Sequence, residues 1–290
     1  DFSQRWHRLL RQLSLENMLL EGQDKLAIVR DIIEQVRLRG DAAVAEFTAR
    51  FDKVNLQPLE FRIPAELLGQ AHQQLAPELM AALRRSIQNV RNYQQAIKLQ
   101  SQPDWTIAGA TLGVRYRPLR RVGVCVPGAS APLVSTVIMT TVPAQVAGVP
   151  EIAIVTSPSY QGSIHPAILA VCCELGITEV YRISGVQAVA ALALGTDTIP
   201  KVDKIVGPSS IWAQLAKKEL FGLVDIDSFA GPSDVLIIAD QTARPDWLAA
   251  DLLSQAEHAP GSAVLLTDNA KLAEAVALEL DRQLSHLTRS

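Results

Sequence analysis

The sequence predicts an α/β protein built from two α/β units with parallel sheets, preceded by N-terminal helices. Three observations support this fold class. The first hundred residues repeat apolar side chains at helical spacing. Beyond residue 126, short β-branched runs alternate with helical segments, a pattern typical of parallel sheets. The length of 290 residues, 48% of them hydrophobic, is enough for about two domains with cores of their own.

Charge and composition exclude several classes of protein. The 27 Lys and Arg and the 30 Asp and Glu leave a formal charge of -3 without long charged runs, so we expect no nucleic-acid partner and no basic membrane-binding face. No apolar run reaches the roughly 18 residues of a membrane span, and the N-terminus lacks a signal-peptide core, so we expect a cytoplasmic protein. The chain neither begins with Met nor ends at a clear boundary, so we expect it to be part of a longer protein.

The N-terminal third reads as four helices. Residues 24–40 form an apolar helical pattern that ends at Gly40, and residues 41–52 restart it with Asp41 as the expected N-cap. Residues 64–75 and 77–99 each open with Pro and an acidic residue, which favour the first turn of a helix.

The remaining chain predicts extended segments between further helices. Residues 112–126 read as two short extended segments with a hairpin turn at Pro118. The β-branched runs that we expect to form strands lie at 151–157, 180–184, 204–207, 234–240 and 263–268. The predicted organisation is an N-terminal extension at 1–23, a discontinuous first α/β domain at 24–124 plus 233–290, and a second α/β domain at 125–232.

Candidate functional residues lie in loops at the ends of strands, where open α/β sheets bind ligands. In the loop 126–136, Gly128 and Ala129 permit close backbone approach, and hydroxyls near a helix start suit an anionic group. The loop lacks the spacing of a dinucleotide fingerprint or a P-loop, so a plain strand-to-helix turn is the alternative. Its hydroxyl-bearing residues are Ser130, Ser135 and Thr136.

Two further loops offer isolated polar residues. Gln187 stands at the head of an Ala-rich helix, and Ser209 and Ser210 follow a Gly-Pro turn, where capping of a helix would explain both serines. Ser233 precedes the strand at 234–240, where satisfying the turn is the simpler reading. The three cysteines, Cys125, Cys172 and Cys173, lack the spacing of zinc ligands and are expected to be reduced, packed thiols.

The segment "DLLSQAEHAP" places Gln255 and His258 one turn apart near the end of a helix. Imidazole nitrogen and amide oxygen at this spacing can converge on one metal ion. The alternative is that His258 compensates the helix dipole in the last turn. The pair alone does not decide between these hypotheses.

Four ordered blocks resemble the histidinol dehydrogenase family: "RVGVCVPGASAPLVSTVIMTTVPAQVAG", "SGVQAVAALALGTDTIPKVDKIVGPSS", "DSFAGPSDVLIIAD" and "DLLSQAEHAPGSAVLLTD". The resemblance implies a fold of two incomplete Rossmann-like domains with parallel sheets, preceded by N-terminal helices, in which residues 125–232 form the second Rossmann-like domain. It also implies a homodimeric, zinc-dependent enzyme that oxidises L-histidinol to L-histidine through the aldehyde, with two NAD in succession. Gln255 and His258 match two zinc ligands that also bind substrate, Ser233 matches a substrate-contacting serine, and Gln187 matches a cofactor contact.

The sequence departs from the family at the cofactor loops. Cys125 stands where the family carries an NAD-contacting tyrosine, Ala129 replaces a glycine, and Ser210 replaces an asparagine that contacts the cofactor. Loss of an aromatic face and of hydrogen-bond reach predicts weaker NAD binding. The family's Glu-His acid/base pair and its remaining zinc ligands, an Asp and a His, match positions beyond residue 290. We therefore expect no catalytic residue in this chain, no dehydrogenase activity from it alone and at most weak metal binding.

Alternatives to a histidinol dehydrogenase remain open. The altered cofactor loops also suit a divergent or non-catalytic paralogue that acts as a binding or assembly protein, whereas the intact "SQAEH" favours the enzyme. A more remote alternative is a metal-dependent hydrolase at the same crevice, which would need a carboxylate near His258.

Overall fold

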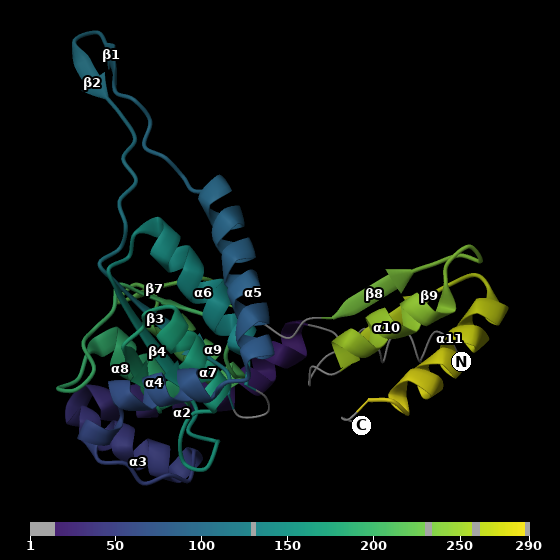
Figure 1. Ribbon diagram of the computed structural model, residues 1–290, viewed down its shortest axis with the longest axis horizontal. Helices are drawn as coiled ribbons and strands as arrows, with labels where there is room; N and C mark the ends of the chain where they lie inside the picture. The colour runs from purple at the N-terminus through teal and green to yellow at the C-terminus, as the bar shows by residue number, and fades with distance from the viewer. Residues whose placement is uncertain (1–14, 129–131, 230–233, 257–261, 288–290) are drawn as a thin grey trace. The chain divides into compact units, whose positions relative to one another are not determined.

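The computed structural model describes residues 15–128, 132–229, 234–256 and 262–287, with side chains from Lys25 onward. The chain divides into two compact units, residues 1–229 and residues 230–290 (Figure 1). Unit 1 thus holds both the 24–124 segment and the 125–229 segment in one compact body. The assignment of residues 233–290 to a discontinuous domain with residues 24–124 stays a prediction.

A five-stranded parallel sheet forms the centre of unit 1. Its strands lie in the order β5-β4-β3-β6-β7, which is the order of the first five strands of a Rossmann fold. The strands are β3 (Arg121–Val126), β4 (Glu151–Thr156), β5 (Glu179–Tyr181), β6 (Lys204–Val206) and β7 (Asp225–Ile226). The order confirms the predicted Rossmann-like parallel sheet. The sequence analysis missed β7, because two residues are too few to show a period.

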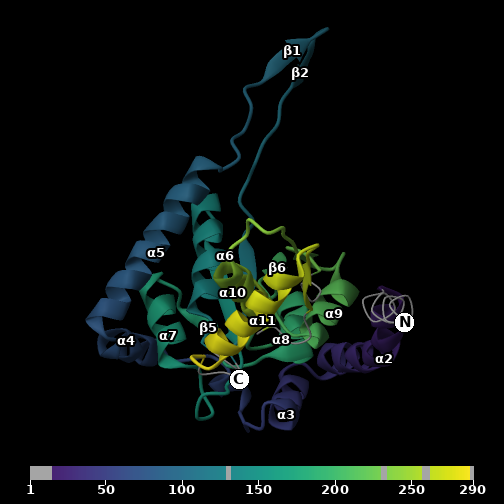
Figure 2. The same ribbon diagram turned by 90° about the vertical axis from the view of Figure 1, so that its right-hand side faces the viewer.

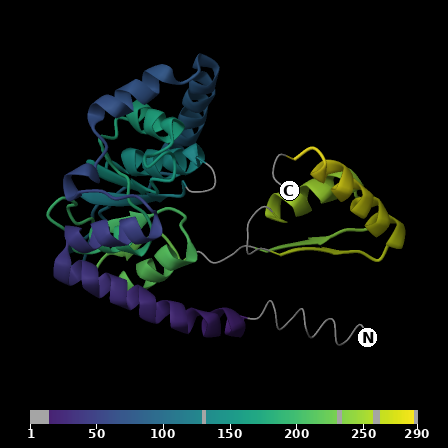
Figure 3. The ribbon, with the colours of Figure 1, turned by 90° about the horizontal axis from the view of Figure 1, so that it is seen from below.

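Helices cover both faces of this sheet, as Figure 3 shows for α2 in purple and α5 in blue. Each face of the sheet packs into a hydrophobic core of its own, and the side chains of β3 alternate between these two cores. Cys125 packs in the first core, whereas Val124 and Val126 pack in the second. The helices packed on the first core are α2 (Leu15–Arg39), α3 (Asp41–Phe51), α8 (Gly185–Leu194) and α9 (Ile211–Leu220). Those on the second are α4 (Ala65–Gln74), α5 (Pro77–Ala96), α6 (Val134–Ala147) and α7 (Pro166–Glu174).

The junction between α2 and α3 differs from the sequence expectation. Gly40, with φ of 53°, takes the N-cap position, and Asp41 is the first helical residue. The predicted N-cap role of Asp41 is therefore wrong. Its buried carboxylate instead accepts a hydrogen bond of 2.9 Å from the Thr198 backbone, which ties α3 to the loop before β6. A short 3-10 helix, η1 (Pro58–Glu60), follows α3.

The hairpin lies earlier in the chain than predicted. Antiparallel strands β1 (Trp105–Ile107) and β2 (Ala110–Leu112) pair around a turn at Ala108 and Gly109 and extend away from the sheet (Figures 1 and 2). Both turn residues have positive φ, 48° and 81°, as a tight hairpin requires. The prediction of a hairpin turn at Pro118 is wrong, because residues 113–119 form no strand and the paired strands lie before them.

Unit 2 is a small βαβ unit with a second helix. Strands β8 (Val235–Ile238) and β9 (Ala263–Leu266) pair in parallel, which confirms both predicted strands. Helices α10 (Pro245–Ala256) and α11 (Ala270–Leu284) pack together, and their core residues are Leu248, Ala249, Leu252, Leu272 and Val276. Within the described parts of the chain, no helix combines the length and the apolar character needed to span a bilayer.

Candidate functional site

A crevice of unit 1 opens at the carboxyl ends of the central strands. The strand order reverses between β3 and β6, and open α/β sheets bind ligands at this switch point. A crevice of about 220 Å³ lies there, and a second cavity of about 450 Å³ shares residues Ser184, Gly185 and Ser210 with it. Polar residues that line the crevice are Asp52, Ser157, Ser184, Ser209 and Ser210.

Two glycines let the loops that border the crevice approach their neighbours. A Cβ on Gly128, directly after β3, would lie 2.7 Å from the Thr156 hydroxyl at the end of β4. A Cβ on Gly207, directly after β6, would lie 2.3 Å from the Cys125 carbonyl oxygen, and its φ of +102° also favours glycine. The close approach of β3 and β6 at the crevice therefore depends on Gly207.

An ion pair between a buried lysine and an exposed aspartate fixes the loop after β6. The Lys217 ammonium, fully buried in α9, lies 2.5 Å from Asp227 Oδ1 and 3.2 Å from the Gly207 carbonyl oxygen. Asp227 Oδ2 accepts the Gly207 N–H at 2.7 Å, so the pair binds both backbone groups of this glycine. Sequence reasoning missed Lys217, although its spacing from the buried Ala213 and Leu220 places it on the inner face of α9.

Gln187 is the most deeply buried of the predicted cofactor contacts. Its side chain lies in the first turn of α8 with 1% of its surface exposed, and it lines the second cavity. Its Oε1 has no hydrogen-bond partner within the described structure, and the same holds for the Ser209 hydroxyl in the crevice. An unsatisfied buried polar atom costs about 1–3 kcal/mol, and a bound ligand could remove that cost.

Asp52 joins three elements at the crevice. It is the C-cap of α3, and its Oδ1 accepts hydrogen bonds from the hydroxyls of Ser157, at 2.9 Å, and Ser184, at 2.8 Å. Gln187 Nε2 lies 3.5 Å from Oδ2. The sequence analysis missed Asp52 because its partners are more than one hundred residues away in the chain.

Cys125 and Ser210 also line the crevice, so the structure brings the three predicted cofactor-contacting residues, Cys125, Gln187 and Ser210, to adjoining cavities. Burial raises the pKa of the Cys125 thiol to about 12, although the charge of Lys217 opposes this rise, so the thiol is neutral at physiological pH. Ser210 is the N-cap of α9, yet its side chain makes no capping hydrogen bond. The predicted free, packed state of Cys125 and Cys172 is confirmed.

The predicted metal and substrate residues, Gln255, His258 and Ser233, all belong to unit 2. Gln255 lies in the last turn of α10 and is partly buried. His258 and Ser233 lie outside the described residues, as does Ala129. In the described ranges, no group of three or more His, Cys, Asp and Glu side chains could hold a metal ion. The zinc and substrate roles of Gln255, His258 and Ser233 stay predictions.

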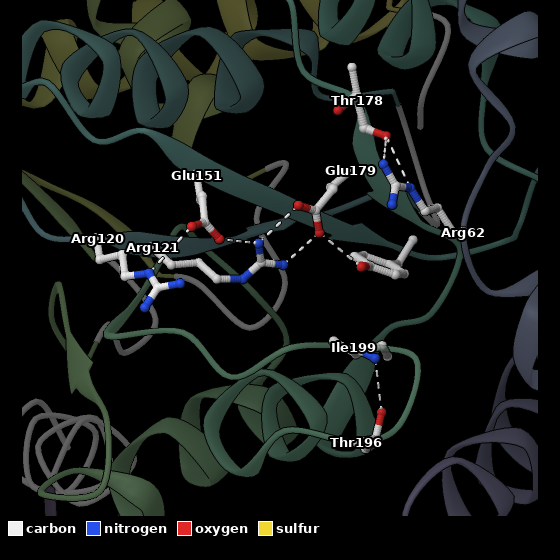
Figure 4. A network of polar contacts seen from close by, with 9 residues as sticks. Arg62, Arg120, Arg121, Glu151, Thr178, Glu179, Thr196 and Ile199 are labelled. Atoms are coloured by element: carbon white, nitrogen blue, oxygen red, sulfur yellow. Dashed lines mark hydrogen bonds and ion pairs between the residues drawn. The ribbon is translucent and has the colours of Figure 1, made fainter.

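The amino ends of the same strands carry an ionic network (Figure 4). Arg121 at the start of β3 donates to Glu179 at 2.5 and 2.9 Å and to Glu151 at 3.0 Å. The hydrogen bond to Glu179 raises the pKa of Arg121, and the same contact lowers the pKa of Glu179. Because these charges lie at the edge opposite the crevice, they join β3, β4 and β5 without lining the crevice.

Comparisons with known proteins agree with this geometry. The family model described as histidinol dehydrogenase matches residues 18–290. The chain is 48% identical over 272 residues to the histidinol dehydrogenase of Moorella thermoacetica, covering 93% of this chain and 64% of that protein. It is 47% identical over 279 residues to that of Rhodopirellula baltica, covering 96% of this chain and 60% of that protein.

A solved structure extends the likeness to the fold. The crystal structure of histidinol dehydrogenase from Elizabethkingia anophelis superposes with a TM-score of 0.83 at 37% identity, covering 91% of this chain and 61% of that one. The chain therefore spans about 60–64% of the length of these three relatives. Because the family model matches nearly the whole length of the chain, the chain belongs to the histidinol dehydrogenase family.

Proposed function

We propose that this chain is the nucleotide-binding and substrate-orienting part of an enzyme that oxidises L-histidinol to L-histidine in two successive NAD-dependent steps. Family membership supports the reaction, and the crevice supports the cofactor. The observation that carries the proposal is Gln187, whose Oε1 is buried and unpartnered within the described structure beside a cavity at the switch point of a Rossmann-like sheet.

The residues around the crevice fit a dinucleotide. Gly128 and Gly207 leave room for the loops to come close, and the Ser209 hydroxyl and Gln187 Oε1 can exchange hydrogen bonds with polar groups of a ligand. Phe51 and Trp212 give the second cavity aromatic surface. NAD, when bound, would accept hydride from the substrate. The chain's own residues would bind and orient the nucleotide and exclude water around it.

Cys125 and Ser210, which differ from the residues of the family at these positions, determine how strongly we expect NAD to bind. A buried neutral thiol offers no aromatic face for stacking, and the short side chain of Ser210 reaches less far than an asparagine amide. We therefore expect NAD to bind, with an affinity limited by these two positions. The same departures favour the second candidate, a non-catalytic paralogue that retains the crevice for binding or assembly.

The metal and partner proposals rest on the family alone. Gln255 and His258 would supply two zinc ligands that orient the substrate, and Ser233 would contact it. The described residues hold only Gln255 of this set, so no reaction step is assigned to zinc. We further propose a homodimer in the cytoplasm, and we expect the 290-residue chain alone to bind NAD without oxidising L-histidinol.

Calorimetric titration of the 290-residue chain with NAD tests the proposal. Gln187→Ala is expected to weaken NAD binding about tenfold, because a buried hydrogen-bonding amide contributes roughly 1–1.5 kcal/mol. Gln88→Ala is the matched control: Gln88 lies on the exposed face of α5, hydrogen-bonded to Asn92, and its loss should leave the affinity unchanged. Absence of NAD binding to the wild-type chain, or equal binding by both variants, would contradict the proposed role of the crevice.

A further inference from the structure

The carboxyl end of β4 is where a Rossmann fold normally places an acidic residue. In such folds the second strand is followed by an Asp or Glu that accepts a hydrogen bond from the ribose 2′-hydroxyl of NAD. Here β4 is the second strand of the sheet in chain order and ends at Thr156. The next nine residues, 157–165, contain no acidic residue, and Ser157 takes the first position.

The fold supplies a carboxylate to this position from another element. Asp52 follows α3, more than one hundred residues before Ser157, and its Oδ1 accepts the Ser157 hydroxyl at 2.9 Å. The Ser184 hydroxyl, at the start of α8, donates to the same oxygen at 2.8 Å. The hydroxyl groups of Ser157 and Ser184 therefore hold the Asp52 carboxylate at the wall of the crevice.

The second carboxylate oxygen retains the capacity to accept. Among the residues that the structure describes, the hydrogen-bond donor to Oδ2 is Gln187 Nε2, at the long distance of 3.5 Å. No Lys or Arg of the described structure forms an ion pair with Asp52, so its negative charge is not neutralised. A carboxylate in this state accepts strongly from a hydroxyl group and repels a phosphate.

We propose that Asp52 determines nucleotide specificity: it binds the adenosine ribose hydroxyls of NAD and excludes the 2′-phosphate of NADP. The inference rests on the proposed function, because it presumes that the crevice binds a dinucleotide. The ribose hydroxyls donate, and Asp52 Oδ2 accepts. A 2′-phosphate has no hydrogen to donate at that position and carries about -1.5 to -2 charge, so it meets the same carboxylate with repulsion.

Calorimetric titrations of the 290-residue chain with NAD and with NADP test this assignment. The wild type is expected to bind NAD at least about tenfold more tightly than NADP, since charge-assisted hydrogen bonds are the strong ones. Asp52→Asn keeps the size and an acceptor oxygen for the two serines but removes the charge. It should bring the two affinities within about threefold, through weaker NAD binding and stronger NADP binding.

Matched variants distinguish the effect of the Asp52 charge in the crevice from the effect of any other negative charge on α3. Glu46→Gln removes one negative charge from the exposed side of α3, where Glu46 pairs with Arg39, and should leave the NAD to NADP ratio unchanged. Ser157→Ala removes one hydrogen bond to Asp52 but keeps its charge, so rejection of NADP should persist. An Asp52→Asn protein that is folded by circular dichroism and retains the wild-type ratio would overturn the proposal.

A measurement on the wild type alone covers the case in which Asp52→Asn does not fold. NAD that lacks the 2′-hydroxyl on its adenosine ribose should bind at least about fivefold more weakly than NAD. Equal binding of the two nucleotides would overturn the role of Asp52 while leaving the proposed function standing. Failure of the wild type to bind either NAD or NADP would overturn the proposed cofactor, and the specificity assignment with it.

Discussion

At the scale of single residues, the crevice depends on side chains whose roles are set by distant partners. The local sequence around Asp52 and Lys217 does not show that either residue has a special role. Asp52 follows the end of a helix, and Lys217 stands beside Lys218 near the end of α9. Gln187, Cys125 and Ser210 could be named from the family resemblance and do line two adjoining cavities. Asp52 could not be named in this way, because its role follows from contacts with residues that are distant in the sequence.

The buried ammonium of Lys217 contributes to stability through its hydrogen bonds. Lys217→Met is expected to lower the free energy of unfolding by about 1–2 kcal/mol, because it removes the hydrogen bonds to the Gly207 carbonyl group and to Asp227. Urea denaturation measures the change. Lys201→Met is the control, since Lys201 is exposed and its loss should cost less than about 0.5 kcal/mol. Equal effects of the two variants would contradict the assigned role of Lys217.

Substitution of Gly207 and of Gly69 by alanine should change the stability of the protein in opposite directions. Gly207→Ala is expected to destabilise unit 1 by about 3 kcal/mol or more, because the new Cβ meets the Cys125 carbonyl oxygen at 2.3 Å and φ is +102°. Gly69 lies within α4 with nothing within 4 Å of its Cβ position. Gly69→Ala should therefore stabilise the protein by about 0.5–1 kcal/mol. Thermal melts of both variants test the opposite signs.

At the scale of elements, sequence periodicity predicted most helices and strands correctly. The alternation of β-branched strands with helices is strong, and β3 confirms it by alternating side chains between two cores. The hairpin was misplaced because its turn, Ala108 and Gly109, depends on backbone angles that a search for proline does not detect. The position of α2 and α3 on one face of the sheet also could not be predicted, because apolar spacing identifies a buried face without naming its partner.

Three helices meet at Glu174, which gives unit 1 an acid-sensitive contact. Arg84 of α5 donates to Glu174 of α7 at 2.7 and 3.0 Å, and His72 of α4 lies 2.6 Å away. These contacts, with Arg84 the larger, lower the pKa of Glu174 from 4.5 to about 2. Because the folded state lowers this pKa, the stabilisation is present above about pH 4.5 and is lost as the pH falls towards 2.

Stability curves measured against pH test this contact. Glu174→Gln should be less stable than the wild type at neutral pH, and the difference should shrink between about pH 4.5 and 2 as the wild-type carboxylate takes up a proton. Urea midpoints at several pH values give the comparison. Gln73→Ala, on the exposed side of α4, changes no ionisable group and serves as the control, so its difference should not vary with pH. A constant difference for Glu174→Gln as well would contradict the contact.

At the scale of the whole molecule, two compact units share a chain that spans about 60–64% of its relatives. Unit 1 holds a crevice at the switch point of a Rossmann-like sheet, which supports the proposed binding of a nucleotide. The predicted zinc ligands, Gln255 and His258, belong to unit 2. The proposed cofactor site and the proposed metal site therefore fall in different units of the chain.

A crystal structure of the 290-residue chain grown with NAD tests the central claim most directly. We expect the nucleotide between the carboxyl ends of β3 and β6, with Gln187 and the Ser209 hydroxyl hydrogen-bonded to it and the adenosine ribose against Asp52. Nucleotide bound elsewhere on the chain, with Gln187 Oε1 still unpartnered in an empty crevice, would contradict the account.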